Sequence, residues 1–280
     1  MPMKPGITMF ASHVLNAYPN RILENAMFRL LKPLPLTVAI AALSIITTGC
    51  ATNSARGRFL NALQNTNAYG GHGATIDVEV NQTKIFSGLG FAAPSSTYTN
   101  IASGNDTFEG FESASSDTVP VFNNLTGNLT GGGQYTLIVA GLSGGSGPFA
   151  PTLIYQHDNN VVPPANMAEF RVINASPDSP PSVDVWIIPE PTGGPSGTCS
   201  SQSNTNCPIS ALAYTNISPY ITLQAVSGGF GFFVTLHGST SLVARTTVPG
   251  TAGSITTVVL VDNENGSSMN PNPVILEDLQ

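Results

Sequence analysis

The sequence contains an internal repeat, which limits the folds that the chain can adopt. Residues 171–188 read RVINASPDSPPSVDVWII, and a looser copy of this segment, RFLNALQNTNAYGGHGATIDVEV, occupies residues 58–80. Each copy ends in a short run in which aliphatic residues alternate with other types, and the alternation keeps the same register in both. A period of two residues is typical of a β-strand with one buried face. The repeat therefore predicts two related β-rich units.

The segments that follow the two copies also correspond to one another. Residues 84–113 align with 211–239, and each contains a short strand, a turn and a second strand with interleaved Phe and Gly. Apolar runs at 134–140 and 254–261 have the β-branched content of central strands that are buried on both faces. With roughly six or seven short strands per copy, we expect an all-β fold of two tandem immunoglobulin-like antiparallel β-sandwich domains.

These alignments set the expected domain boundaries. The first sandwich is predicted at 56–156 and the second at 169–280, and a proline-containing linker at 157–168 joins them. The second repeat also contains an insertion at 190–208 that the first repeat lacks. Because the linker is short and partly stiff, the two sandwiches are expected to touch.

Residues 1–50 are predicted to be a leader region. Residues 27–50, MFRLLKPLPLTVAIAALSIITTGC, combine a basic start, an apolar run and small residues before a cysteine. This is the layout of a secretory signal, and the apolar run is shorter than the roughly 20 residues that span a membrane. We therefore expect a signal peptide, with Met27 as the true start of the chain.

The ending Thr-Thr-Gly-Cys resembles a bacterial lipobox. The resemblance implies that Cys50 receives a diacylglyceryl group and becomes an acylated N-terminus, although Thr47 stands where Leu, Val or Ile is usual. The alternative is an ordinary signal peptide beside an unmodified cysteine. Ala51 follows the cysteine, and by resemblance to lipoprotein sorting this favours the outer membrane. The expected localisation is the cell envelope, with a lipid anchor as the contact with the membrane.

The second copy of the repeat resembles the bacterial domain-of-unknown-function 4397 family. Members typically have an Arg-x-x-(His/Asn)-Ala-Ser-Pro-Asp-x-Pro segment followed by Val-Asp-Val. The first copy has the equivalent Arg, Asn, Ala and Ile-Asp-Val but lacks Ser-Pro-Asp. The resemblance implies a secreted or surface-associated protein and supplies no catalytic residue. The matching residues are Arg171, Asn174, Ala175, Ser176, Pro177, Asp178, Pro180, Val183, Asp184 and Val185.

Charge and cysteine content limit the partners and cofactors. The chain has 16 acidic residues against 9 Lys and Arg, and this acidic balance argues against nucleic acid and against anionic lipid as direct ligands. Cys199 and Cys207 lie in the insertion, and a pair of cysteines in an exported protein predicts a disulfide. Two thiols without a nearby histidine are too few ligands for a zinc site. We expect no metal and no cofactor.

Two residues of the second repeat are candidates for contact with a ligand. Trp186 is predicted on the strand face opposite the aliphatic residues, where it could stack against a sugar or a partner. Alternatively, the insertion covers Trp186, or the side chain faces the second sheet. Asp178 could join a calcium site with loop carbonyls, as could residues 262–264, but we favour a role for Asp178 in holding a turn.

A possible nucleophile motif lies in the first repeat. Gly141-Leu-Ser143-Gly-Gly145 fits the G-x-S-x-G spacing of a hydrolase, but that motif requires a following helix, whereas Gly147 and Pro148 follow here. We therefore assign no catalytic residue. The sequence predicts an envelope lipoprotein that acts as a structural or binding module in adhesion or assembly. Glycan binding by an envelope protein is the alternative. A serine hydrolase that uses Ser143 is the competing hypothesis in which the protein is an enzyme, and we favour it less.

Overall fold

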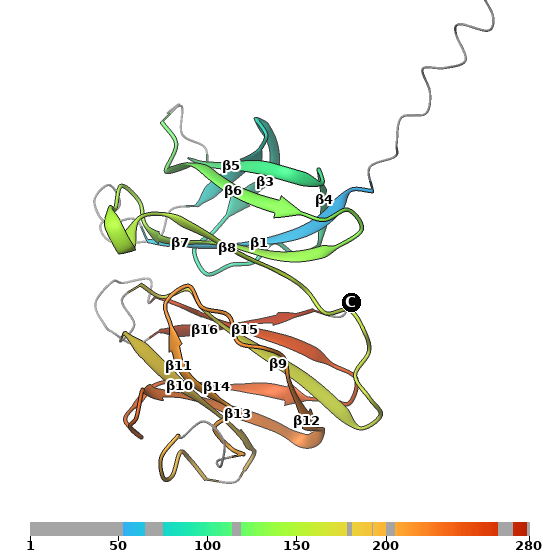
Figure 1. The fold of residues 1–280 in the computed structure, drawn as a ribbon, viewed down its shortest axis with the longest axis vertical. Coiled ribbons are helices and arrows are strands. Elements are labelled where there is room, and N and C mark those ends of the chain that lie inside the picture. Colours follow the sequence, from blue (N-terminus) through green and yellow to red (C-terminus); the bar gives the residue numbers. More distant parts are fainter. Residues whose placement is uncertain are drawn as a thin grey trace, which may run out of the picture. The chain divides into compact units, whose positions relative to one another are not determined.

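The structure, a computed structural model, is all-β in the residues that it describes (Figure 1). These residues are 53–64, 75–113, 119–177, 181–191, 193–199, 205–262 and 271–278. The predicted signal region with Cys50 lies outside them, and so does Asp178. Within the described part, strands β1 to β16 form four sheets, and the short 3-10 helix η1 (Gly147–Phe149) follows β7.

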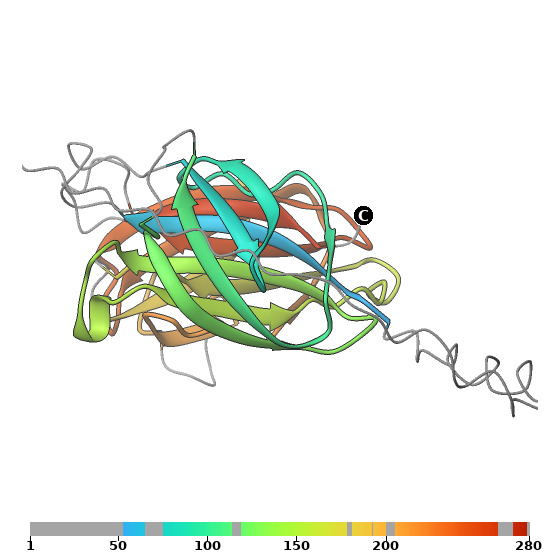
Figure 2. The same cartoon turned by 90° about the horizontal axis from the view of Figure 1, so that it is seen from above.

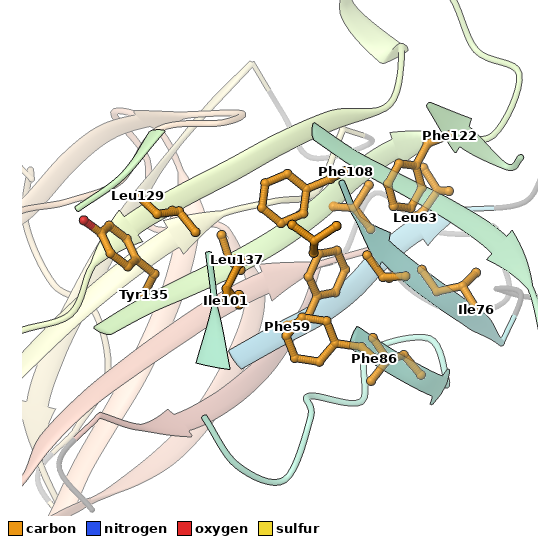
Figure 3. Close-up of a cluster of buried hydrophobic side chains, with 14 of the residues drawn as sticks. Phe59, Leu63, Ile76, Phe86, Ile101, Phe108, Phe122, Leu129, Tyr135 and Leu137 are labelled. Atoms are coloured by element: carbon orange, nitrogen blue, oxygen red, sulfur yellow. The ribbon is translucent and has the colours of Figure 1, made fainter. Parts of the chain in front are cut away.

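The first sandwich is built from β1 to β8. One sheet has the strand order β4-β1-β7-β8, and the other has the order β3-β2-β5-β6. A core of aliphatic and aromatic side chains, including Phe59, Phe108 and Leu137, fills the space between them (Figure 3). The strands are β1 (Ala55–Gln64), β2 (Ile76–Val80), β3 (Thr83–Leu89), β4 (Thr99–Ile101), β5 (Gly104–Glu112), β6 (Phe122–Leu129), β7 (Gln134–Leu142) and β8 (Thr152–His157).

The second sandwich repeats this arrangement strand for strand. Its sheets have the orders β12-β9-β15-β16 and β11-β10-β13-β14, and a second core that includes Phe170 and Phe232 lies between them. The prediction of two tandem β-sandwiches is confirmed. The strands are β9 (Met167–Asn174), β10 (Ser182–Pro189), β11 (Ile209–Ala213), β12 (Ile221–Gln224), β13 (Val226–Leu236), β14 (Leu242–Gly250), β15 (Ile255–Val261) and β16 (Asn272–Glu277).

Each sandwich contains one parallel strand pair, which the sequence patterns did not predict. β1 pairs with β7, and β9 pairs with β15, whereas the other named pairs are antiparallel. All four of these strands are buried over most of their length. Parallel pairs occur where both faces of a sheet are covered, and here the second face is covered by the other sandwich. The continuous apolar runs at 134–140 and 254–261 are therefore central strands, as predicted.

The asparagine of the repeated motif closes each sandwich in the same way. The side-chain amide of Asn61 donates to the carbonyl of Leu89 at 3.1 Å, and that of Asn174 donates to Leu212 at 3.2 Å. Both asparagines are fully buried. Because a buried amide needs hydrogen-bond partners, this position ties the end of the first strand of each repeat to the returning third strand.

Asp106 in the first sandwich has a buried carboxyl group in which only one of the two oxygens has a hydrogen-bond partner among the described residues. Asp106 on β5 is 2% exposed and faces the same side as Phe108. One carboxyl oxygen accepts a 2.6 Å hydrogen bond from the amide of Asn81, and the other has no hydrogen-bond partner among the described residues. Burial raises the pKa of Asp106, although the bond from Asn81 opposes this shift.

We predict that Asp106→Asn stabilises the protein at neutral pH by about 1 kcal/mol, since it removes a buried charge without changing the shape. A raised pKa means that the contribution of Asp106 to stability is complete below its ordinary value of 3.8 and is lost as the pH rises through the folded-state pKa. The gain should therefore shrink in acid. Urea unfolding at two pH values measures it, and an equal gain at both would contradict the assignment.

Candidate functional site

The two sandwiches meet through the sheets β4-β1-β7-β8 and β12-β9-β15-β16 (Figure 1). The outer faces of these sheets share a third apolar cluster, to which both repeats contribute equivalent strands. This contact buries the second face of each central strand. The cluster consists of Leu60, Ala62, Ile138, Ala140 and Ile154 from the first sandwich and Ile173, Ala175, Val259, Val261 and Leu276 from the second.

Beside this cluster lies a buried polar network, which begins at Arg58 on β1. The Arg58 side chain faces away from the core of its own sandwich and is 4% exposed. Its Nε donates to Thr136 Oγ1 at 2.9 Å, and its Nη1 donates to the carbonyl of Glu277 at 2.6 Å. Its Nη2 forms an ion pair with Asp278. The arginine of the first repeat is therefore held by the end of the second.

Arg171 on β9 makes the reciprocal set of contacts. Its Nε donates to Thr257 Oγ1 at 2.9 Å, its Nη1 donates to the carbonyl of His157 at 3.4 Å, and its Nη2 pairs with Asp158. A longer contact of 3.5 Å joins Nη2 to Asp278. The arginine of the second repeat is therefore held by the end of the first.

Two tyrosines complete the network and support the carboxylates. The hydroxyl of Tyr98 donates to Asp158 at 2.8 Å, and that of Tyr220 donates to Asp278 at 2.7 Å. Each ring also lies against the arginine of its own repeat, with Cζ 5.2 Å and 4.7 Å from the ring centroid, respectively. Burial and the neighbouring carboxylates raise the pKa of both hydroxyls, so they remain protonated donors.

The network has approximate two-fold symmetry in its connections. Each aspartate accepts bonds from a threonine and a tyrosine of its own repeat and pairs with the arginine of the other repeat. The two arginines and two aspartates balance in charge, and all four side chains are buried. A buried pair of this kind adds little net stability, but losing one partner leaves an uncompensated charge. The network can therefore fix how the two sandwiches dock, and we call it the crossed arginine–aspartate network.

We predict that Arg58→Met destabilises the protein by about 3 to 5 kcal/mol because Asp278 loses its closest ion-pair partner in a buried site and keeps only the 3.5 Å contact to Arg171. Combining it with Asp278→Asn should cost less than the sum of the two single changes, since the orphaned charge is removed. Urea unfolding of the single and double variants measures both effects.

The pair between Arg245 and Glu190 provides a matched control. Arg245 Nη2 lies 2.7 Å from Glu190 Oε1, so this ion pair is also a close one. The side chains of Arg245 and Glu190, however, are 50% and 19% exposed. Arg245→Met should cost at most about 1 kcal/mol. Equal losses for Arg58→Met and Arg245→Met would contradict the role assigned to the crossed arginine–aspartate network.

Of the alternatives that the sequence left open for Trp186, the structure supports cover by the insertion over an exposed stacking surface. Trp186 does lie on the face of β10 opposite the aliphatic residues, but it is only 1% exposed. It packs in a small cluster with Cys199, Cys207 and Phe233, and its Nε1 donates to Thr235 at 3.0 Å. Cys199 and Cys207 of the insertion therefore cover this face of the sheet, and the predicted disulfide between them is present with a Cα–Cα distance of 5.5 Å.

We predict that replacing Cys199 and Cys207 together by alanine destabilises the protein by about 2.5 kcal/mol on the loop-closure estimate. It should also shift the fluorescence of Trp186 to longer wavelengths, as water reaches the ring. Trp186 is the only tryptophan, so the emission reports this site alone. Emission that stays unchanged in the double variant would show that the insertion does not depend on the disulfide to cover the ring.

The aspartates of the Ile-Asp-Val segment in the first repeat and the Val-Asp-Val segment in the second accept hydrogen bonds from neighbouring segments of the outer sheets. Hydrogen bonds from Lys84, Ser113 and the backbone of Gly88 lower the pKa of Asp77 to about 2. Asp184 is fully buried, which opposes ionisation, yet hydrogen bonds from His237 and from backbone amides lower its pKa. Both carboxylates therefore remain charged and serve as structural acceptors.

The other sequence candidates are not brought together with one another. The hydroxyl of Ser143 lies 3.4 Å from the carbonyl of Val121, to which it donates. In the part of the chain that the structure describes, no group of three or more His, Cys, Asp or Glu side chains is placed to hold a metal ion. Nor does any helix there have the length and apolar character needed to cross a membrane.

Sequence reasoning missed the partners of the two arginines. Asp158 was assigned to the linker at 157–168, whereas β8 extends to His157 and Asp158 itself is fully buried. A signal was present: an acid follows the last strand of each repeat, at Asp158 and Asp278, and an arginine recurs at the same place in each first strand, at Arg58 and Arg171. An arginine within an otherwise apolar strand needs a carboxylate partner.

Fold and interface together define a protein of two quasi-equivalent β-sandwiches joined through a buried ionic contact. The model of the family described as Domain of unknown function (DUF4397) matches residues 58–186, which confirms the family resemblance predicted from the sequence. The matched segment covers the first sandwich from Arg58 onward and ends within β10 of the second.

No curated protein matches the chain. Among solved structures, a leucine-rich repeat protein from Bacteroides thetaiotaomicron is similar at 10% sequence identity, with 74% of this chain and 26% of that chain covered. The TM-score of this match is 0.18, so it carries no conclusion about fold or function.

Proposed function

We propose that the protein is a lipid-anchored module of the cell envelope that displays two locked β-sandwiches and acts in adhesion or assembly. The observation that carries this proposal is the crossed arginine–aspartate network, because it couples the two sandwiches through buried charges. A module that holds a partner at a fixed place outside the cell needs this kind of coupling. A flexible pair of domains would instead move independently about the linker.

The anchor in this proposal is Cys50, acylated after removal of the signal peptide. β1 begins at Ala55, so the segment between the acylated residue and the first strand spans at most about 18 Å when fully extended. The first sandwich would therefore stay close to the membrane, with the outer membrane favoured. Two or three acyl chains are sufficient for stable anchoring without a spanning helix.

Adhesion or assembly is preferred to glycan binding because the candidate aromatic platform is covered. Trp186 was the only aromatic side chain assigned to such a platform, and it is 1% exposed. The outer sheets end in the edge strands β3, β6, β11 and β14. Edge strands offer unpaired backbone groups to which a protein partner can add a strand. An envelope protein is therefore the class of partner that we propose.

Expression of the full chain in a bacterium with two membranes tests the anchor. We predict that labelled palmitate is incorporated, that mass spectrometry finds an acylated Cys50 at the N-terminus, and that the protein fractionates with the outer membrane. Cys50→Ala should abolish labelling and move the protein to the soluble fraction, since the acyl chains are the proposed anchor.

Cys199→Ala combined with Cys207→Ala is the control, because it removes the other two cysteines and should keep full labelling. An intact leader with an unmodified thiol at position 50 would refute the proposed anchor.

A further inference from the structure

One end of the described structure gathers the start of the first strand, several neutral turns and the linker. Ser54 accepts a 3.1 Å hydrogen bond from the amide of Gly132, and the amide of Arg56 donates to Gly133 at 2.9 Å. Figures 1 and 2 both show the start of β1 and the segment between β8 and β9 on the same side. We call this side the anchor end, because the chain reaches it directly after Cys50.

The linker is fixed at both of its ends. The amide of Asp158 donates to the carbonyl of Gln134 at 2.8 Å, and the amide of Asn159 donates to the hydroxyl of Tyr220 at 3.1 Å. At the other end, the amide of Met167 donates to Pro164 at 3.0 Å. The segment between these points is therefore a defined tip.

This tip presents two consecutive large apolar side chains to the outside. Val161 is 74% exposed and Val162 is 63% exposed, and the amide of Val161 is held by the side chain of Asn159 at 3.0 Å. Val162 lies beside Gly253 in the turn between β14 and β15. Single exposed apolar residues are ordinary, whereas two adjacent ones form a small apolar patch that another surface can cover.

The tip carries no exposed charge, although the whole chain has a formal net charge of −7. The one ionisable residue at 158–166 is Asp158, which is fully buried and paired with Arg171. The neighbouring turn at 251–254, Thr-Ala-Gly-Ser, is also neutral. A neutral apolar tip avoids the repulsion that acidic side chains would meet at an anionic lipid surface.

We infer that Val161 and Val162 insert into the interfacial region of the lipid bilayer and form a second contact with the membrane beside the acyl anchor. This inference rests on the proposed lipidation of Cys50. The chain from Cys50 to Asn53 extends at most about 10 Å, so the start of β1 stays within that distance of the bilayer. The segment between β8 and β9, which carries the valine pair, lies on the same side of the molecule as this start. Because the tether holds this side towards the bilayer, lipid is the occupant that we propose for the valine pair.

The contact also defines an orientation. With the acyl chains and the valine pair both in the membrane, the strands would run away from the bilayer. Leu242, which is 52% exposed, begins β14, whereas Gly250 ends it beside the anchor end. At about 3.3 Å per residue, Leu242 lies about 26 Å from Gly250 along the strand and would remain in water.

Site-specific fluorescence of the full-length acylated protein in phospholipid vesicles tests the inference. Val162→Cys introduces a free thiol, because Cys50 is acylated and Cys199 is bonded to Cys207. The thiol is labelled with a polarity-sensitive nitrobenzoxadiazole probe, and the vesicles contain lipid brominated near the headgroup. We expect the emission of the probe to shift to shorter wavelengths when the protein binds vesicles. We also expect its intensity to be about twofold or more lower in brominated vesicles than in vesicles of the same lipid without bromine, as for a side chain buried about 5 to 10 Å deep.

Leu242→Cys with the same probe is the matched control, since it places the probe on an exposed apolar position at the opposite end. It should show neither effect. Adding Val161→Asp to the Val162→Cys variant should abolish quenching at position 162, because a charge is expelled from the interface.

Mass spectrometry of the same samples separates this inference from the proposed anchor. Acylated protein whose Val162 probe stays in water, or whose Leu242 probe is quenched equally, would overturn the inference alone. A blue-shifted but unquenched probe would mean that another protein chain covers the tip, which also overturns it. A non-acylated wild-type protein would instead overturn the proposed anchor.

Discussion

Two buried arginines impose the arrangement on which the rest of the structure depends. Arg58 and Arg171 each occupy a central strand on the face that points away from their own core, so each needs a carboxylate from outside its own sheet. Each finds it at the end of the other repeat, at Asp278 and Asp158. Because an unpaired charge in this position would cost several kcal/mol, the two sandwiches satisfy each other's arginine only when they dock in this one way.

The crossed contact has the character of an isologous dimer interface within a single chain. In such an interface the same patch occurs on both sides, and residue i contacts j while j contacts i. Here the linker makes the association intramolecular, which raises the effective concentration of one sandwich for the other. A contact of moderate intrinsic strength is then sufficient. This accounts for an interface that combines an apolar cluster with four charged side chains and remains specific in its register.

The sequence predicted the two sandwiches because alternation is a local property, visible in Ile76 to Val80 and again in Val183 to Ile187. It predicted the disulfide because two cysteines flank one loop. The network could not be predicted in the same way, since Arg58 and Asp278 are 220 residues apart and no local pattern records their pairing. The parallel direction of the β1–β7 pair was not predicted either, because β1 and β7 are far apart in the sequence and no local pattern records their pairing. The strand face of Trp186 was correct, but its burial depends on an insertion that folds back over it.

The two repeats differ on their outer sheets, which do not take part in the interface between the sandwiches. Arg, Thr, Tyr and Asp recur at equivalent places on the inner sheets. A change to one of these residues in one repeat would leave a buried charge of the other repeat without its partner. The outer sheets carry no such mutual requirement. There Glu79 of the first repeat corresponds to Trp186 of the second, and only the second has the disulfide-closed cover. A surface free to change is where specificity for a partner can arise, so the outer sheets, rather than the inner ones, are the places to look for recognition.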